Sequence, residues 1–140
     1  MTARRALLAN ASFTAASAAI LIAAADALYP LFGLRSSALL TTIGVVLLGY
    51  AASLVLEARR EPPQRYALVT AALLDAGWVV GSIIVLALAW SALAPAGRVL
   101  IITAALVVEG FAFLQFRVSR TMSPLSSPSV SAAQPPTGAP

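Results

Sequence analysis

The sequence contains no cysteine and no histidine, and all nine of its basic residues are arginine, so lysine is absent as well. Without thiols, imidazoles and amines, the chain cannot form disulfides, ligate haem, zinc or iron–sulfur clusters through these groups, or form a lysine Schiff base. No nucleophile–base pair stands out among the remaining residues. The sequence therefore predicts no catalytic, cofactor-binding or metal-ligating residues, and it predicts that the protein is not an enzyme.

Charge is also scarce. Only 10% of the residues are charged and 60% are hydrophobic, whereas a soluble domain usually carries about 25% charged residues. This composition is typical of an integral membrane protein, whose main partner is the lipid bilayer. The net charge of +4 does not predict a nucleic-acid partner, because the arginines lie at the ends of apolar runs, where they orient membrane spans.

Four apolar runs organise the chain. Each is roughly 18–24 residues long, which suffices for a helix to cross a hydrocarbon core of about 30 Å. The runs cover approximately residues 6–28, 38–56, 66–89 and 99–116. Because the links between them are short, the sequence predicts an all-α fold, a transmembrane four-helix antiparallel bundle over residues 1–120. Residues 121–140 are uncharged and rich in serine and proline, and they predict a disordered cytoplasmic tail.

The arginines predict how the chain is threaded. Two of them, Arg35 and Arg98, fall on one side of the membrane if all four runs span it. The other seven fall on the opposite side: Arg4, Arg5, Arg59, Arg60, Arg65, Arg117 and Arg120. The positive-inside rule then places both termini in the cytoplasm of a bacterium, with the protein in the inner membrane. The first run could instead be a signal peptide, but it is longer than a usual apolar signal region, so we expect it to be retained.

Two carboxyl groups lie inside the apolar runs. At about 1.5 Å per residue, Asp75 and Glu109 both lie roughly 12–13 Å from the cytoplasmic ends of their spans. Thr14 and Tyr50 come out near the same depth, so the sequence predicts an intramembrane polar layer of these four residues. An ionised carboxyl near mid-membrane costs at least about 2.5 kcal/mol. The acids are accommodated if they face inward, either as structural hydrogen-bonding groups or as a proton or cation site.

Other residues of the spans predict helix packing. Gly77 and Gly81 form a G-x-x-x-G motif that marks a close helix contact, within the bundle or between copies. Asn10 and Ser17 share one face of the first span with Thr14, and this polar stripe is expected to face inward.

Asp26 lies at the outer end of the first span, away from this layer. Arg35 and Arg98 lie at the same outer edge, so either could pair with Asp26. The sequence therefore predicts an outer-edge ion pair that joins two spans.

Two segments carry a resemblance to a known group of proteins. The stretch LLANASFTAAS, residues 7–17, resembles the start of a set of small bacterial four-span integral membrane proteins of unknown function, in which Asn10 and Ser17 match. The stretch TAALLDAGWVVGS, residues 70–82, is similar to the third span of that set, which often carries an acid and a tryptophan. The resemblance implies a fold and a location, and it implies no activity.

These observations favour a small membrane protein with a non-enzymatic structural or accessory role, which self-associates or joins a larger membrane complex. The alternative is a proton-coupled small-solute or ion carrier or channel that uses Asp75 and Glu109. Small multidrug transporters are also about this long and have four spans. Their essential glutamate lies in the first span, however, where this chain has only Asn10 near that depth and Asp26 at the outer edge.

Overall fold

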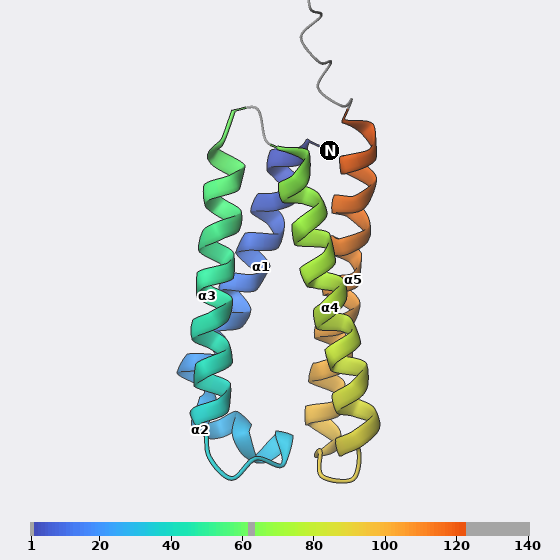
Figure 1. Cartoon of the computed structure of the whole chain (residues 1–140). Coiled ribbons are helices and arrows are strands. Elements are labelled where there is room, and N and C mark those ends of the chain that lie inside the picture. Colours follow the sequence, from blue (N-terminus) through green and yellow to red (C-terminus); the bar gives the residue numbers. More distant parts are fainter. Residues whose placement is uncertain (1, 62–63, 123–140) are drawn as a thin grey trace, which may run out of the picture.

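A computed structural model describes residues 2–61 and 64–122. In chain order, the elements are α1 (Ala3–Ala23), α2 (Ala25–Leu28), the short 3-10 helix η1 (Tyr29–Phe32), α3 (Ala38–Arg59), α4 (Arg65–Ala89) and α5 (Pro95–Thr121) (Figure 1). The fold is all-α, and α1, α3, α4 and α5 are each long and apolar enough to cross a membrane. These four helices correspond to the four predicted spans.

The long helices extend beyond most of the apolar runs that predict them. The Thr2 hydroxyl accepts a hydrogen bond from the Arg5 backbone N–H and caps α1, and Pro95 begins α5, where its missing N–H costs nothing. Helix α5 continues to Thr121, so its last turn includes the first residue of the predicted tail. Residues 123–140 of that tail lie outside the described residues.

The first span is shorter than the apolar run suggests. The prediction of one helix over 6–28 is wrong at Ala24, whose backbone (φ −107°, ψ 14°) leaves the helical region and separates α1 from α2. The chain then turns through η1 toward the start of α5, where the Leu31 carbonyl accepts a hydrogen bond of 2.9 Å from the Ala94 N–H. The break therefore lets the chain reach the second half of the molecule.

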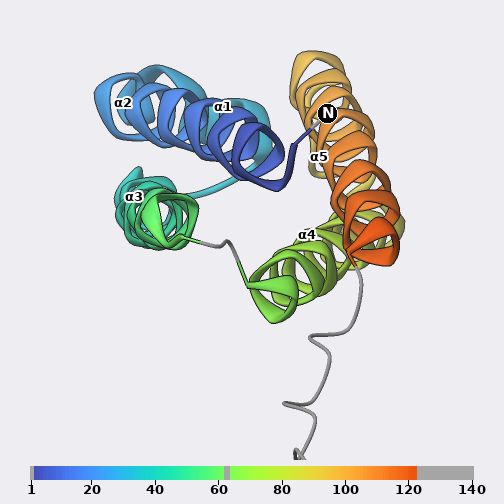
Figure 2. The same ribbon diagram turned by 90° about the horizontal axis from the view of Figure 1, so that it is seen from above.

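The four long helices form two antiparallel pairs, α1 with α3 and α4 with α5 (Figures 1 and 2). Helix α1 also packs against α5, whereas α3 and α4 have little contact despite the short link between them. The predicted antiparallel bundle is confirmed, but its halves are joined mainly through α1 and α5.

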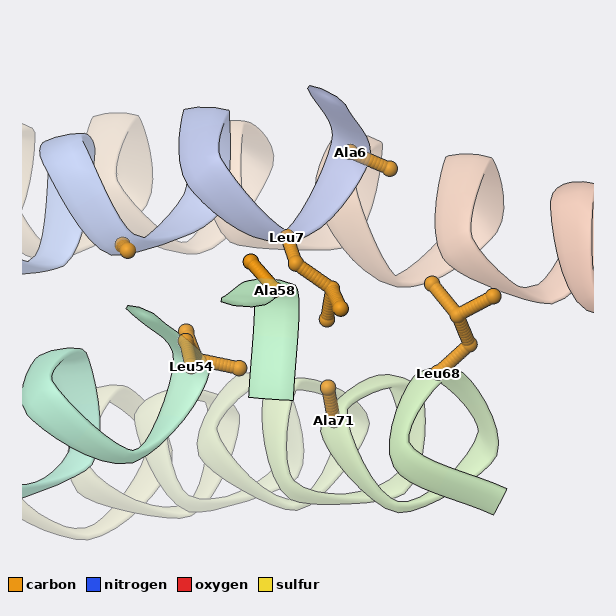
Figure 3. Close-up of a cluster of buried hydrophobic side chains, with 7 residues drawn as sticks. Ala6, Leu7, Leu54, Ala58, Leu68 and Ala71 are labelled. Carbon is orange, nitrogen blue, oxygen red and sulfur yellow. The ribbon is translucent and has the colours of Figure 1, made fainter. Parts of the chain in front are cut away.

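At the end that holds the α1 N-terminus, small and medium apolar side chains fill the core. This cluster consists of Ala6, Leu7, Ala11, Leu54, Ala58, Leu68 and Ala71, from α1, α3 and α4 (Figure 3). Small side chains let membrane helices approach closely. The Arg65 side chain adds a hydrogen bond of 3.1 Å from Nε to the Ser119 carbonyl, which links the start of α4 to the end of α5.

At the opposite end, backbones meet where glycine leaves space. A Cβ atom placed on Gly97 would lie 2.2 Å from the Leu31 carbonyl oxygen, and one on Gly33 would lie 2.5 Å from the Ala92 oxygen. Gly33 also has a φ of 65°, a conformation that glycine adopts without strain. This glycine junction holds η1 against the α4–α5 link.

Candidate functional site

Asp75 lies on the buried face of α4, with only 4% of its surface exposed. Ala71, Ala72 and Ser82 are buried on the same face. Their small side chains leave room for neighbouring helices to reach the carboxyl group. Asp75 is therefore an interior residue of the bundle and does not face lipid.

Each of the other three long helices donates one hydrogen bond to the Asp75 carboxyl group. Asn10 Nδ2 of α1 lies 2.6 Å from Oδ2, and Gln115 Nε2 of α5 lies 3.3 Å from the same oxygen. The Tyr50 hydroxyl of α3 lies 3.0 Å from Oδ1. All three groups donate, as a carboxylate requires because it only accepts hydrogen bonds.

A second set of hydrogen bonds orients these donors. The Thr14 hydroxyl donates to Asn10 Oδ1 over 3.2 Å, which leaves the Asn10 amide nitrogen to face Asp75. The Tyr50 hydroxyl also lies 3.4 Å from the Ala71 carbonyl oxygen. We refer to Asn10, Thr14, Tyr50, Asp75 and Gln115 together as the polar cluster.

The structure brings together Thr14, Tyr50 and Asp75 of the predicted layer, but Glu109 does not join them. The Glu109 side chain is exposed on α5, and Gln115 provides the α5 contact with Asp75 instead. Depth alone placed Glu109 in the layer. Gln115 lies six positions after Glu109, which turns the two side chains about 120° apart on a helix of 3.6 residues per turn.

Gln115 is the cluster residue that sequence reasoning missed. It is fully buried, and it shares a face of α5 with the buried residues Ala112 and Ser119 at spacings of three and four. The spacing of these three residues is visible in the sequence, but an uncharged amide within an apolar span is a weaker signal of a polar site than an acid, because it costs less to bury.

The predicted packing residues have different surroundings. Asn10 is buried in the polar cluster, and Ser17 is half-buried on α1. Gly77 and Gly81 are exposed on α4, and a Cβ atom on either would have no heavy atom within 4 Å. Their G-x-x-x-G motif thus mediates no contact within the described part of the chain. A close glycine contact occurs instead at Gly44, where a Cβ would lie 2.6 Å from Ile22 Cγ1.

The predicted outer-edge ion pair is also absent from the described residues. Asp26 and Arg35 are exposed, and the Arg98 guanidinium lies over the Trp90 ring, 4.3 Å from its centroid. A cation over the face of tryptophan is attracted by the ring quadrupole, so Arg98 has an aromatic partner where a carboxylate was expected. The salt bridges of the described residues lie at the other end of the bundle, Arg4–Glu61 at 4.0 Å and Arg60–Glu57 at 3.2 Å.

The polar cluster offers little to a metal or cofactor. It contains a single carboxylate, and three donors already occupy that group. Within residues 2–61 and 64–122, no three acidic residues lie close enough to hold a metal ion. A shallow groove of about 270 Å³ between α1 and α3 is lined mainly by alanine, leucine and valine, and no residue of the polar cluster lines it.

Four apolar helices around a hydrogen-bonded carboxyl group define a multi-pass integral membrane protein with four spans. Comparisons with protein-family models, with curated proteins and with solved structures gave no match to this chain. The resemblance to small bacterial four-span proteins thus rests on residues 7–17 and 70–82. The structure joins these two segments through the hydrogen bond between Asn10 and Asp75.

Proposed function

We propose that this protein is a non-enzymatic structural or accessory component of the bacterial inner membrane. The observation that carries the proposal is the position of the Asp75 carboxyl group, which receives one hydrogen bond from each of the other three long helices. In lipid, helices associate through packing and interhelical hydrogen bonds, because no hydrophobic force acts between them. A carboxyl group that joins four helices in this way serves primarily to hold the bundle together.

The distribution of arginine supports cytoplasmic positions for both termini. Arg35 and Arg98 lie at the end of the bundle where α4 is linked to α5. The other seven arginines lie at the opposite end, near the start of α1, the α3–α4 link and the end of α5. The arginine-rich end of a membrane bundle faces the cytoplasm, and a structural role is compatible with this orientation.

The proposal is tested by Asp75→Asn in purified protein, with Glu109→Gln as the matched acid-to-amide control on the exposed surface. Unfolding in detergent and proton flux into liposomes are measured for both variants and for the unmodified chain. We expect Asp75→Asn to lower stability and the control to leave it unchanged, with no flux from any of the three proteins. Proton flux by the unmodified chain that Asp75→Asn abolishes without a loss of stability would contradict the structural role.

The second candidate function is a proton-coupled carrier or channel that uses Asp75 alone. One observation favours it. Gln115 Oε1 is buried beside the carboxyl group and has no hydrogen-bond partner in the described part of the chain. Such an acceptor can bind a proton carrier such as water. This candidate relies on Asp75 alone, since Glu109 is exposed on α5 and forms no contact with the polar cluster among the described residues.

A further inference from the structure

The exposed side of α5 carries a regular pattern. Side chains at alternating spacings of three and four residues all face away from the rest of the molecule: Val99, Ile102, Leu106, Glu109, Phe113, Phe116 and Arg120. This spacing is the a/d pattern of a coiled coil, in which such positions pack against a second helix. We call these seven residues the exposed stripe. Another side of α5, with Ala112, Gln115 and Ser119, is already buried within the molecule.

Glu109 is the central residue of the exposed stripe. It lies 14 residues after Pro95 and 12 before Thr121, which places it about 21 Å and 18 Å from the two ends of the helix. It is therefore well inside a hydrocarbon core of about 30 Å. The remaining residues of the stripe up to Phe116 are apolar and compatible with lipid. A carboxylate that faces lipid at this depth costs at least about 2.5 kcal/mol.

No group of the described chain compensates this cost, since Glu109 takes part in none of the hydrogen bonds or salt bridges formed by residues 2–61 and 64–122. The neighbouring Gly110 is exposed, and a Cβ atom placed there would have no heavy atom within 4 Å. A second helix can therefore approach α5 closely beside the carboxyl group. Both features indicate a partner in the membrane that covers Glu109.

We propose that the exposed stripe packs against the same stripe of a second copy of this chain, and that the two Glu109 carboxyl groups meet and share a proton. Copies inserted in the same orientation present parallel α5 helices. In a parallel a/d contact, each position meets its own counterpart. A shared proton lets one carboxyl group donate to the other, which satisfies both without a basic residue. The inference is independent of the structural role proposed for Asp75.

A second copy fits better than an unrelated helix because the pattern is self-complementary. The stripe has one polar position within its apolar part, and a single polar a or d position fixes register and partner number in coiled coils. The stripe ends at Arg120, whose guanidinium lies over the Phe116 ring, 4.7 Å from its centroid. At the end of the helix, the two Arg120 side chains can separate toward the headgroups, so their charges do not oppose the contact.

Cross-linking tests the geometry directly, because the natural chain has no cysteine. Single cysteines are placed on the stripe by Leu106→Cys and Phe113→Cys, and off the stripe by Val107→Cys, which is also exposed on α5. In liposomes under mild oxidation, we expect disulfide-linked dimers of the two stripe variants and far less of the Val107→Cys variant. Equal cross-linking of all three variants, or none, would overturn the proposal.

Dilution in liposomes tests the carboxyl pair. Glu109→Leu removes the interhelical hydrogen bond and is expected to raise the dimer dissociation constant about 3- to 30-fold, the range for one such bond in a membrane. Glu109→Gln keeps a self-complementary hydrogen-bonding group and is expected to change it less. A chain that stays monomeric overturns the proposal, as does a Glu109→Leu variant that associates as tightly as the unmodified chain. A Glu109-dependent complex formed only with a different membrane protein also rules out the second copy.

Discussion

Replacing Asp75 by leucine removes the acceptor at the centre of the polar cluster while keeping a side chain of similar size. Asn10 Nδ2 and Gln115 Nε2 would then lie in the interior with no hydrogen-bond acceptor at their present positions. The Tyr50 hydroxyl would keep a weaker contact, the Ala71 carbonyl oxygen at 3.4 Å. The variant therefore leaves two buried amide groups unsatisfied.

Two estimates give the loss of unfolding free energy, one from the donors left unsatisfied and one from the hydrogen bonds removed. Each buried donor left without a partner costs about 1–3 kcal/mol, so the two amides give about 2–6 kcal/mol. Hydrogen bonds between membrane helices contribute about 0.6 kcal/mol on average, and the three bonds to Asp75 then give about 2 kcal/mol. We expect Asp75→Leu to lower the free energy of unfolding by about 2–6 kcal/mol.

Unfolding in mixed micelles, followed by the loss of helical circular dichroism as dodecyl sulfate is added, measures this change. Glu109→Leu, at a high ratio of micelles to protein that keeps copies apart, is the control and should change stability by less than about 0.5 kcal/mol. The double variant Asp75→Leu with Asn10→Leu should lose less free energy of unfolding than the sum of the two single variants, because it also removes the Asn10 amide that Asp75→Leu leaves without an acceptor. A loss below about 0.5 kcal/mol for Asp75→Leu would refute the role of the carboxyl group.

Three further predictions concern other parts of the molecule. Gly97→Ala should lower the unfolding free energy by about 1–3 kcal/mol in the same titration, because its Cβ would lie 2.2 Å from the Leu31 carbonyl oxygen. The control Gly77→Ala should be neutral or stabilising by up to about 1 kcal/mol. Equal effects of the two variants would contradict the glycine junction. Tyr50→Phe should cost about 0.5–1.5 kcal/mol, the value of one hydrogen bond, and no measurable loss would remove Tyr50 from the cluster. A fluorescent reporter that folds only in the cytoplasm, fused after Met122, should be bright, and a dark fusion would reverse the threading.

Much of the fold could be predicted from the sequence, because lipid imposes a length and a composition on each span. The starts of α3 and α4 differ from the predicted runs by at most one residue. The ends were harder to predict, since helices continue past the apolar core into flanking arginines such as Arg117 and Arg120. The break at Ala24 could not be predicted in this way, because the sequence has no proline or glycine at that position.

The polar cluster was only partly predictable, because a sequence gives depth more reliably than rotation. Depth correctly grouped Thr14, Tyr50 and Asp75, but it also included Glu109, which lies on another side of α5. Choosing Gln115 instead requires knowing which face of α5 meets α4. That choice depends on the packing of the whole bundle. A glycine motif likewise did not predict which glycines make close contacts. Gly77 and Gly81 of the G-x-x-x-G motif are exposed, whereas the isolated Gly33 and Gly97 lie against the backbone of other segments.

The division of the bundle into two helix pairs has a consequence for biogenesis. Since α1 packs mainly on α3 and α4 mainly on α5, each pair joins segments that are close in sequence and leave the ribosome one after the other. Contacts between near neighbours form quickly, whereas contacts between distant segments wait for loop closure. We therefore expect each hairpin to enter the bilayer as a preassembled unit, and the late step of maturation to be the lateral meeting of two hairpins already inserted.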